Sequence, residues 1–343
     1  MELSARKKEI LSEIVKLYIE TGEPIGSKLL ATRLAASPST ATLRAEMSEL
    51  ERLGFLKQPH TSAGRLPTSM AYRLYVNELM PKESISNDSR EIIDKMLIDI
   101  NPEPESIGSA AAQILTTLTG LPAIYAENAE NGAVMKKVTL LPMGRSSVII
   151  FTITADGRNR SRLIHCKFPL TEENLNLFLE ICEKNIQGKH LSELNKAYLQ
   201  SVTASAGLDA LSLAPLFAAL FDMAEELNRT RVDMRGEANL FTMLDSDFSA
   251  KGVLRLLSSS DTAQSILSLS NDSVGVVFGD DTEFDELKPT GIIYASYGAA
   301  SELGRLAVIG PTRMSYERII PSIEYLAEKV GTILNEMLKG MEE

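Results

Sequence analysis

The sequence predicts an α+β fold in which a small helical head precedes a larger mixed body. Capped helical segments and one short hairpin fill residues 1–80. Predicted strands and helices fill most of the remainder, and a purely helical stretch interrupts them. With 343 residues, 44% of them hydrophobic, the chain has enough apolar material for two or three domains.

Charge is distributed unevenly along the chain. The net charge is -11, which by itself argues against a nucleic-acid partner. Residues 1–80, however, contain 11 Lys and Arg against 9 Asp and Glu, so the acidic excess lies in the remainder. A mildly basic head on an acidic body can contact DNA through one end only, because phosphates repel the rest.

The sequence favours a cytoplasmic protein. Cys166 and Cys182 are the two cysteines, too few for a disulfide framework in a chain of this size. The N-terminus is charged and amphipathic, unlike a signal peptide. The longest apolar runs, such as residues 147–152, are too short to span a membrane, so we expect no membrane partner.

Polar caps and glycines predict three helices in the head. Ser4, Ser27 and Ser39 are placed to open successive helices, and Gly22 and Gly54 to end the first and the third. The third helix has a periodic apolar stripe, formed by Leu43, Met47, Leu50 and Leu53. Its opposite face carries small residues and one arginine, namely Ala41, Ala45, Ser48 and Arg52, and is flanked by Thr42 and Arg44.

That outer face has two interpretations. Short side chains let a helix enter the major groove deeply, where methyl groups of Ala and Thr can meet thymine and Arg44 can bind guanine. Alternatively, small residues on a solvated helix are simply good helix formers.

A hairpin follows the third helix. Residues 55–59 and 64–67 are predicted strands, with the tip at residues 60–63. Candidate contacts to phosphate or the minor groove surround this tip, namely Lys57, His60, Thr61, Ser62 and Arg65. In a purely structural interpretation, Pro59 and Pro67 protect an exposed hairpin edge. Three helices followed by a hairpin is the order of elements in a winged helix-turn-helix DNA-binding domain.

The body alternates between mixed and helical stretches. Strands are predicted at residues 134–141, 147–154 and 158–165, and Thr171 is placed to cap a helix. Ser106 is a second predicted cap, for a helix ending at residue 118. The further helical segments expected are 191–202, 213–227, 250–257, 262–269 and one beginning at Ser315. The further strands expected are 274–278, 291–296 and 302–309.

Four runs carry a resemblance to a known family. They are PIGSKLLA (24–31), STATLRAEMSELERLGFLKQPHTSAGRLPT (39–68), AYRLYVNEL (71–79) and VIGPTRMSYERII (308–320). In order and separation they closely resemble the HrcA family of heat-inducible transcription repressors. Residues 278–282 depart from the Gly-(Asp/Glu)-Glu-Asn pattern of that family.

The resemblance implies a domain organisation. A winged helix-turn-helix domain would occupy residues 1–80, and a GAF-like domain residues 90–165 and 230–343. A helix-rich inserted dimerisation domain would occupy residues 166–229. It also implies that the protein represses chaperone operons, that heat relieves repression, and that the chaperonin maintains activity.

The functional hypothesis also includes a two-fold symmetric assembly. One recognition helix reads few base pairs, so we expect a homodimer on an inverted-repeat operator in double-stranded DNA. The residues expected to read bases are Ser39, Thr40, Thr42 and Arg44. Those expected to clamp the backbone or minor groove are Lys57, His60, Thr61 and Arg65.

Other classes of site have weak support. No phosphate-binding glycine loop or nucleophile elbow occurs, and we expect neither a cofactor nor catalysis. His165, Cys166, Cys182 and His190 lack metal-chelate spacing, so buried thiols are the preferred account. Residues 310–313 could hold an anionic effector at a helix start, although a structural turn is the favoured alternative.

Two alternative functions stay open at this point. The protein could be a metabolite-responsive regulator whose GAF-like domain binds a small ligand. It could also be an enzyme or ligand-binding protein whose head domain is structural. A ligand that raises the melting temperature and changes DNA affinity would support the first alternative. Under the second, changing Arg44 and Arg65 should leave all measurable activity intact.

Overall fold

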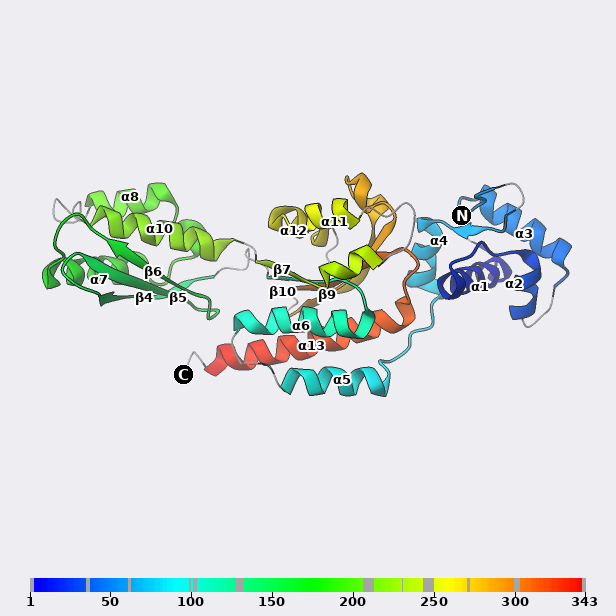
Figure 1. Cartoon of the computed structure of the whole chain (residues 1–343), viewed down its shortest axis with the longest axis horizontal. Helices are drawn as coiled ribbons and strands as arrows, with labels where there is room; N and C mark the ends of the chain where they lie inside the picture. The colour runs from blue at the N-terminus through cyan, green and yellow to red at the C-terminus, as the bar shows by residue number, and fades with distance from the viewer. Residues whose placement is uncertain are drawn as a thin grey trace.

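A computed structural model describes residues 3–34, 38–60, 63–98, 100, 104–127, 133–205, 213–229, 231–242, 250–269, 272–298 and 303–340. Three lobes lie in a row, with the first 80 residues at one end (Figure 1). We call residues 3–80 the head, residues 87–127 and 231–340 the central domain, and residues 133–229 the inserted module.

The head contains the predicted helices and hairpin. Its elements are α1 (Ala5–Thr21), α2 (Ser27–Arg33), α3 (Thr40–Arg52), β1 (Leu56–Lys57), β2 (Leu66–Pro67), α4 (Ser69–Leu74) and the π-helix η1 (Tyr75–Leu79). Ser4 caps α1 by accepting a bond from the Lys7 amide, and Gly22 ends it with a φ of 70°. Gly54 follows α3 with a φ of 85°, as predicted for a helix end.

The central domain is built on one antiparallel sheet. Its strands are β3 (Ala123–Glu127), β7 (Val232–Arg235), β8 (Val274–Phe278), β9 (Thr290–Tyr297) and β10 (Gly304–Pro311), in the order β7-β3-β10-β9-β8. Its helices are α5 (Asn87–Ile98), α6 (Pro104–Thr119), η3 (Glu237–Thr242), α11 (Ala250–Leu257), α12 (Ser260–Leu267), η4 (Gly279–Asp281), η5 (Asp285–Leu287) and α13 (Tyr316–Gly340).

Helices cover both faces of this sheet (Figure 1). Tyr125 and Val308 point to the face that α6 and α13 cover, and they share a core with the head. Ile124 and Ala307, their neighbours along the same strands, belong to a second core with α11 and α12. This alternation explains why the strands read as nearly continuous apolar runs.

The inserted module has its own sheet and its own core. Its elements are β4 (Met135–Pro142), β5 (Ser147–Thr154), β6 (Asn159–His165), α7 (Glu172–Asn185), η2 (Leu191–Glu193), α8 (Lys196–Ser205) and α10 (Ala214–Asn228). The three antiparallel strands have the order β4-β5-β6. Thr171 caps α7 within a reciprocal capping box, as its sequence predicts.

The expected boundary of this module at residue 166 needs correction. The strands at 135–165 were assigned to the domain at 90–165, yet Val148 and Ile150 pack with Phe178 and Leu220 in one buried cluster. Strands and helices therefore bury a common core, and the module begins near residue 133. The expected cap at Ser106 is also wrong, because α6 already begins at Pro104.

Candidate nucleic-acid interface

The third helix of the head presents a largely uncovered outer face. Ser39 Oγ accepts a bond from the Thr42 amide at 3.1 Å, which satisfies one of the free N–H groups at the helix start. The inner stripe is buried, as predicted, at Leu43, Met47 and Leu50. The outer face is exposed to solvent at Ser39, Thr40, Ala41, Thr42, Arg44, Ala45 and Ser48.

Arg44 is anchored to the neighbouring helix. Its Nε donates to Ser27 Oγ at 3.3 Å, and Ser27 is the first residue of α2 with 8% of its surface exposed. In the described part of the chain Arg44 forms no salt bridge. The anchor restricts the guanidinium without neutralising it, which suits bidentate contact with a base.

The hairpin after α3, which we call the wing, lies where it was predicted, but its strands β1 and β2 pair over only two residues each. Leu56 pairs with Pro67 and Lys57 with Leu66. Lys57 and His60 are exposed, as a surface for phosphate requires. The remaining tip residues, Thr61 and Ser62, lie outside the described residues.

Arg65 occupies a different environment from the one expected. Its Nε lies 2.9 Å from Glu51 Oε2, and 17% of its side chain is exposed. Its backbone exchanges two 2.9 Å bonds with Ile25, which joins the wing to the segment before α2. Arg65 thus links the wing to α3 and is mostly covered, while its contact with phosphate stays a prediction.

Gly64 explains how closely the wing approaches that segment. A Cβ at this position would lie 2.4 Å from the carbonyl carbon of Ile25 and 2.6 Å from the Pro24 oxygen. Only a residue without a side chain fits between these backbone atoms.

Lys28 is a further candidate for a DNA contact, which the sequence did not single out. It is exposed on α2 and belongs to no salt bridge within the described ranges. In a helix-turn-helix the helix before the recognition helix crosses the DNA backbone, where a cation binds phosphate. The expected cap at Ser27 is wrong, because Gly26 is the N-cap of α2 and no side chain caps this helix. A lysine in the first turn of a helix that precedes the recognition helix was the available signal.

Arg52, at the far end of α3, is already paired. Its guanidinium donates to Glu49 at 2.9 and 2.7 Å. This contact lowers the pKa of the Glu49 carboxyl and raises that of Arg52. The exposed cation on the outer face nearest the helix start is therefore Arg44.

The cysteines and histidines of the inserted module differ in burial: both thiols lie in one buried core, whereas His165 and His190 are exposed. Cys166 and Cys182 are buried, and burial raises the pKa of both thiols. His165 is exposed and its Nδ1 lies 2.9 Å from Ser147 Oγ. Among the described residues no cluster of three His, Cys, Asp or Glu side chains could hold a metal ion. In the same ranges, none of the helices has the length and apolar character needed to cross a bilayer.

An exposed, small-residue helix beside a paired wing defines a winged-helix DNA-binding regulator. The model for the winged helix-turn-helix transcription repressor domain, HrcA DNA-binding, matches residues 2–80. The model for the HrcA protein C-terminal domain matches residues 105–320. The chain belongs to the HrcA family of heat-inducible transcription repressors.

Relatives extend this similarity along the whole chain. A heat-inducible transcription repressor HrcA of Acetivibrio thermocellus is 28% identical over 338 residues, covering 96% of each chain. The protein of the same name in Clostridioides difficile is 31% identical, covering 95% of this chain and 98% of its own. A crystal structure described as a hypothetical protein has the same fold, with a TM-score of 0.66, 22% identity and coverage of 98% and 99%.

Proposed function

We propose that the chain represses transcription by binding an inverted-repeat operator in double-stranded DNA as a homodimer. The observation that carries this proposal is the exposed outer face of α3, on which Arg44 is anchored but not neutralised. Short side chains on that face let the helix enter a major groove. Occupying the operator excludes polymerase, so repression needs no catalytic residue.

We assign two kinds of DNA contact. The base-reading residues are Ser39, Thr40, Thr42 and Arg44. The residues for the backbone or minor groove are Lys28, Lys57, His60 and Thr61. Arg65 would contribute indirectly, because its link to Glu51 fixes the wing against α3.

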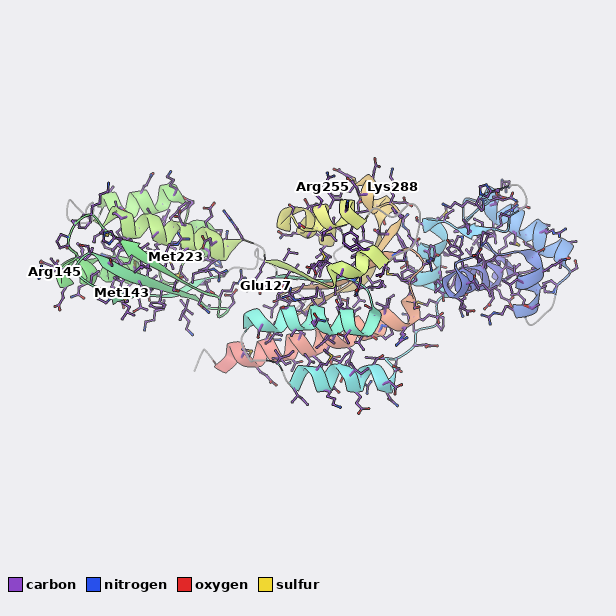
Figure 2. All side chains as sticks on the ribbon, in the orientation of Figure 1. Glu127, Met143, Arg145, Met223, Arg255 and Lys288 are labelled. Carbon is purple, nitrogen blue, oxygen red and sulfur yellow. The ribbon has the colours of Figure 1, made fainter. Side chains whose placement is uncertain are left out.

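The proposed dimer uses the inserted module. One face of its sheet packs on helices, while the other exposes large apolar side chains, namely Leu141, Met143, Phe151, Ile153 and Leu163. Met143 lies toward the far end of this lobe, away from the head (Figure 2). A contiguous apolar sheet face in water favours burial against a second copy.

The cross-strand register gathers these residues into a patch. Leu141 lies opposite Ile149, which in turn lies opposite Leu163. Phe151 lies in the next row, opposite Thr139 and Ser161. Such cross-strand neighbours are close enough to act as one surface.

Changing Phe151 to Glu tests the dimer. A carboxylate in the middle of the patch should prevent dimerisation, because burying an unpaired charge is costly. Light scattering should then give the mass of the monomer, 37.5 kDa. Leu269→Glu is the matched control, since Leu269 is similarly exposed but lies on the central domain. A Phe151→Glu protein that stays dimeric would refute this interface.

Three further assignments accompany the proposal. The central domain is GAF-like, as supported by its antiparallel sheet with helices on both faces. The protein works in the cytoplasm, where its DNA partner lies. The chaperonin keeps it active, and this is supported by three separate buried cores and an exposed apolar face, which are features of chains that need help to fold.

Footprinting on the promoters of the protein's own genome tests the repressor function. We expect two protected half-sites related by a two-fold axis, upstream of chaperone genes. After mild heating, recovery of the footprint should depend on added chaperonin and ATP. Uniform protection of all fragments would contradict a specific operator, while recovery without chaperonin would contradict only that partner.

A further inference from the structure

The head is seated on the central domain by a buried aromatic cluster. Tyr72 of α4 packs against Phe278 and Tyr316, with ring centroids 6.3 and 5.9 Å away. Phe278 and Tyr316 also contact each other at 6.3 Å. All three side chains are at most 1% exposed. Aromatic rings packed in this way resist rotation of one part against the other.

Polar contacts surround this cluster. Arg73 donates to Asp281, and its guanidinium lies 5.7 Å from the centre of the Phe278 ring. The neighbouring hydroxyl of Ser69 donates to Asp280. We call the head seat the aromatic cluster, these polar residues, and the contacts of Tyr75 and Lys16 with Glu317.

A second set of bonds joins the head to the start of α13. The Tyr75 hydroxyl donates to Glu317, and Lys16 Nζ lies 3.8 Å from the same carboxylate. Burial and Glu317 together raise the pKa of Tyr75, so this hydroxyl stays a donor at neutral pH. Tyr316 and Glu317 lie within the run at 308–320, whose function the DNA-reading helix does not explain.

The position of the seat along the chain is informative. Ser69, Arg73 and Tyr75 follow the wing directly, and Tyr75 is buried in the same core as Leu43 and Leu50 of α3. The covalent link to the central domain, residues 81–86, is extended and free of regular structure. Without the seat, such a link would let the head swing; with it, the head has one orientation.

We propose that the head seat determines which half-site spacing the repressor accepts. This inference rests on the proposed function, because spacing has meaning only for a dimer on an inverted repeat. Each base pair of spacing moves a half-site by about 3.4 Å and about 35° around the helix. A rigid seat satisfies one spacing, whereas a loose seat lets both heads find half-sites over several spacings.

The variant Asp280→Asn with Asp281→Asn tests the seat without touching the DNA surface. Both positions lie on the central domain, and Asn keeps the oxygen that accepts the Phe278 amide at 3.1 Å. The charge that pairs with Arg73 is lost. The matched control is Glu286→Gln, which removes the charge of a nearby surface pair with Arg255 at 2.8 Å and lies outside the head seat.

Binding is measured on duplexes whose half-sites are separated by successive single-base-pair increments over one helical turn. The unmodified protein and Glu286→Gln should prefer one spacing. In the double variant the ratio of affinities between the best spacing and one half a turn away should fall at least about fivefold. The salt dependence of the affinity should be the same in the double variant and the unmodified protein, because the phosphate contacts are unchanged.

Two results would overturn the inference separately from the proposed function. One is an unchanged spacing preference in the double variant, and the other is an equal loss of affinity at every spacing. An unmodified protein that binds all duplexes equally would overturn the proposed function as well.

Spin labels provide a readout independent of DNA. Glu9→Cys places a label on an exposed position of α1, and the native Cys166 and Cys182 are buried. We expect a narrow distance distribution between the two heads of the dimer and a broader one after Glu317→Gln or the double Asn change. Identical distributions in all three proteins would contradict a seat that fixes the head.

Discussion

Arg44 and Arg65 show how surroundings decide the function of a residue. Arg44 is exposed on the outer face of α3 and has one bond to a neutral hydroxyl. Arg65 is mostly covered, and its guanidinium lies 2.9 Å from Glu51. A cation that already has a carboxylate partner gains less from a phosphate. The two arginines should therefore respond differently to replacement.

Replacing Arg44 with Ala should weaken specific binding by about 1–3 kcal/mol, because a bidentate base contact is lost. Affinity for random DNA should change much less. Ser27→Ala keeps the Arg44 guanidinium and removes only its anchor, so this variant should lose less operator affinity than Arg44→Ala. Fluorescence anisotropy on operator and scrambled duplexes measures both. Equal losses on the two duplexes would argue against base reading by Arg44.

Replacing Lys57 with Ala should weaken binding to every sequence alike. The slope of log affinity against log salt should also become shallower by about 1, because one phosphate contact is lost. Arg65→Ala should instead lower the melting temperature of the head, since it leaves Glu51 without its partner. If Arg65→Ala changed the salt slope and left stability intact, it would be a direct phosphate contact.

At the scale of elements, the recognition helix depends on its cap. Ser39 accepts the Thr42 amide, and the same hydroxyl lies 2.9 Å from Thr42 Oγ1. The residue that starts the helix thus also orders a neighbouring side chain on the proposed DNA surface. Folding and DNA reading are coupled at this one position.

Two substitutions of Ser39 separate these roles. Ser39→Ala removes the cap and should destabilise the protein by about 1 kcal/mol. Ser39→Asp keeps a capping oxygen and should leave the melting temperature close to that of the unmodified protein. Its negative charge should nevertheless abolish operator binding, because it faces phosphate. Full operator affinity in Ser39→Asp would place Ser39 outside the interface.

Local signals predicted the helix ends and the outer face of α3. Ser39 and Thr171 act as caps because capping involves only neighbours in sequence. Strand β3 and strand β7 were not predicted, since they have only five and four residues and are defined by pairing with partners far along the chain. The Arg65–Glu51 pair was missed because it depends on how the wing packs against α3, which no local pattern states.

The boundary of the inserted module shows a similar limit. Its three strands alternate like those of any half-buried sheet, so their pattern does not say which helices cover them. Only the packing of Val148 against residues such as Phe178 assigns them to the module. The seat residues Asp280 and Asp281 were likewise visible only as a departure from the family pattern.

At the scale of the whole molecule, two junctions connect three lobes, namely the head, the central domain and the inserted module. The head seat is one junction. At the other, Arg158 of the inserted module lies 3.9 Å from Glu127 of the central domain and donates to the Leu227 carbonyl at 3.0 Å. Glu127 is labelled beside this junction in Figure 2. The central domain thereby separates the proposed dimer surface from the proposed DNA-binding surface.

Alkaline pH should destabilise the folded chain. Burial raises the pKa of the Cys182 thiol and of the Tyr297 and Tyr316 hydroxyls above their ordinary values of 9.0 and 10.0. The folded state binds these protons more tightly, so stability is fully present below pH 9 and decreases as pH rises above it.

Urea titrations at about pH 8 and about pH 10.5 measure this effect. The midpoint should be lower at the higher pH, and Cys182→Ala should remove the part of the decrease that begins near pH 9. An unchanged midpoint would show that these groups ionise equally in both states.

The most direct test compares the affinity of the purified protein for an inverted-repeat operator with its affinity for a scrambled duplex of equal length and composition. At physiological salt we expect operator binding to be at least about a thousandfold tighter, as paired recognition helices require. Equal affinities for the two duplexes would contradict sequence reading by α3.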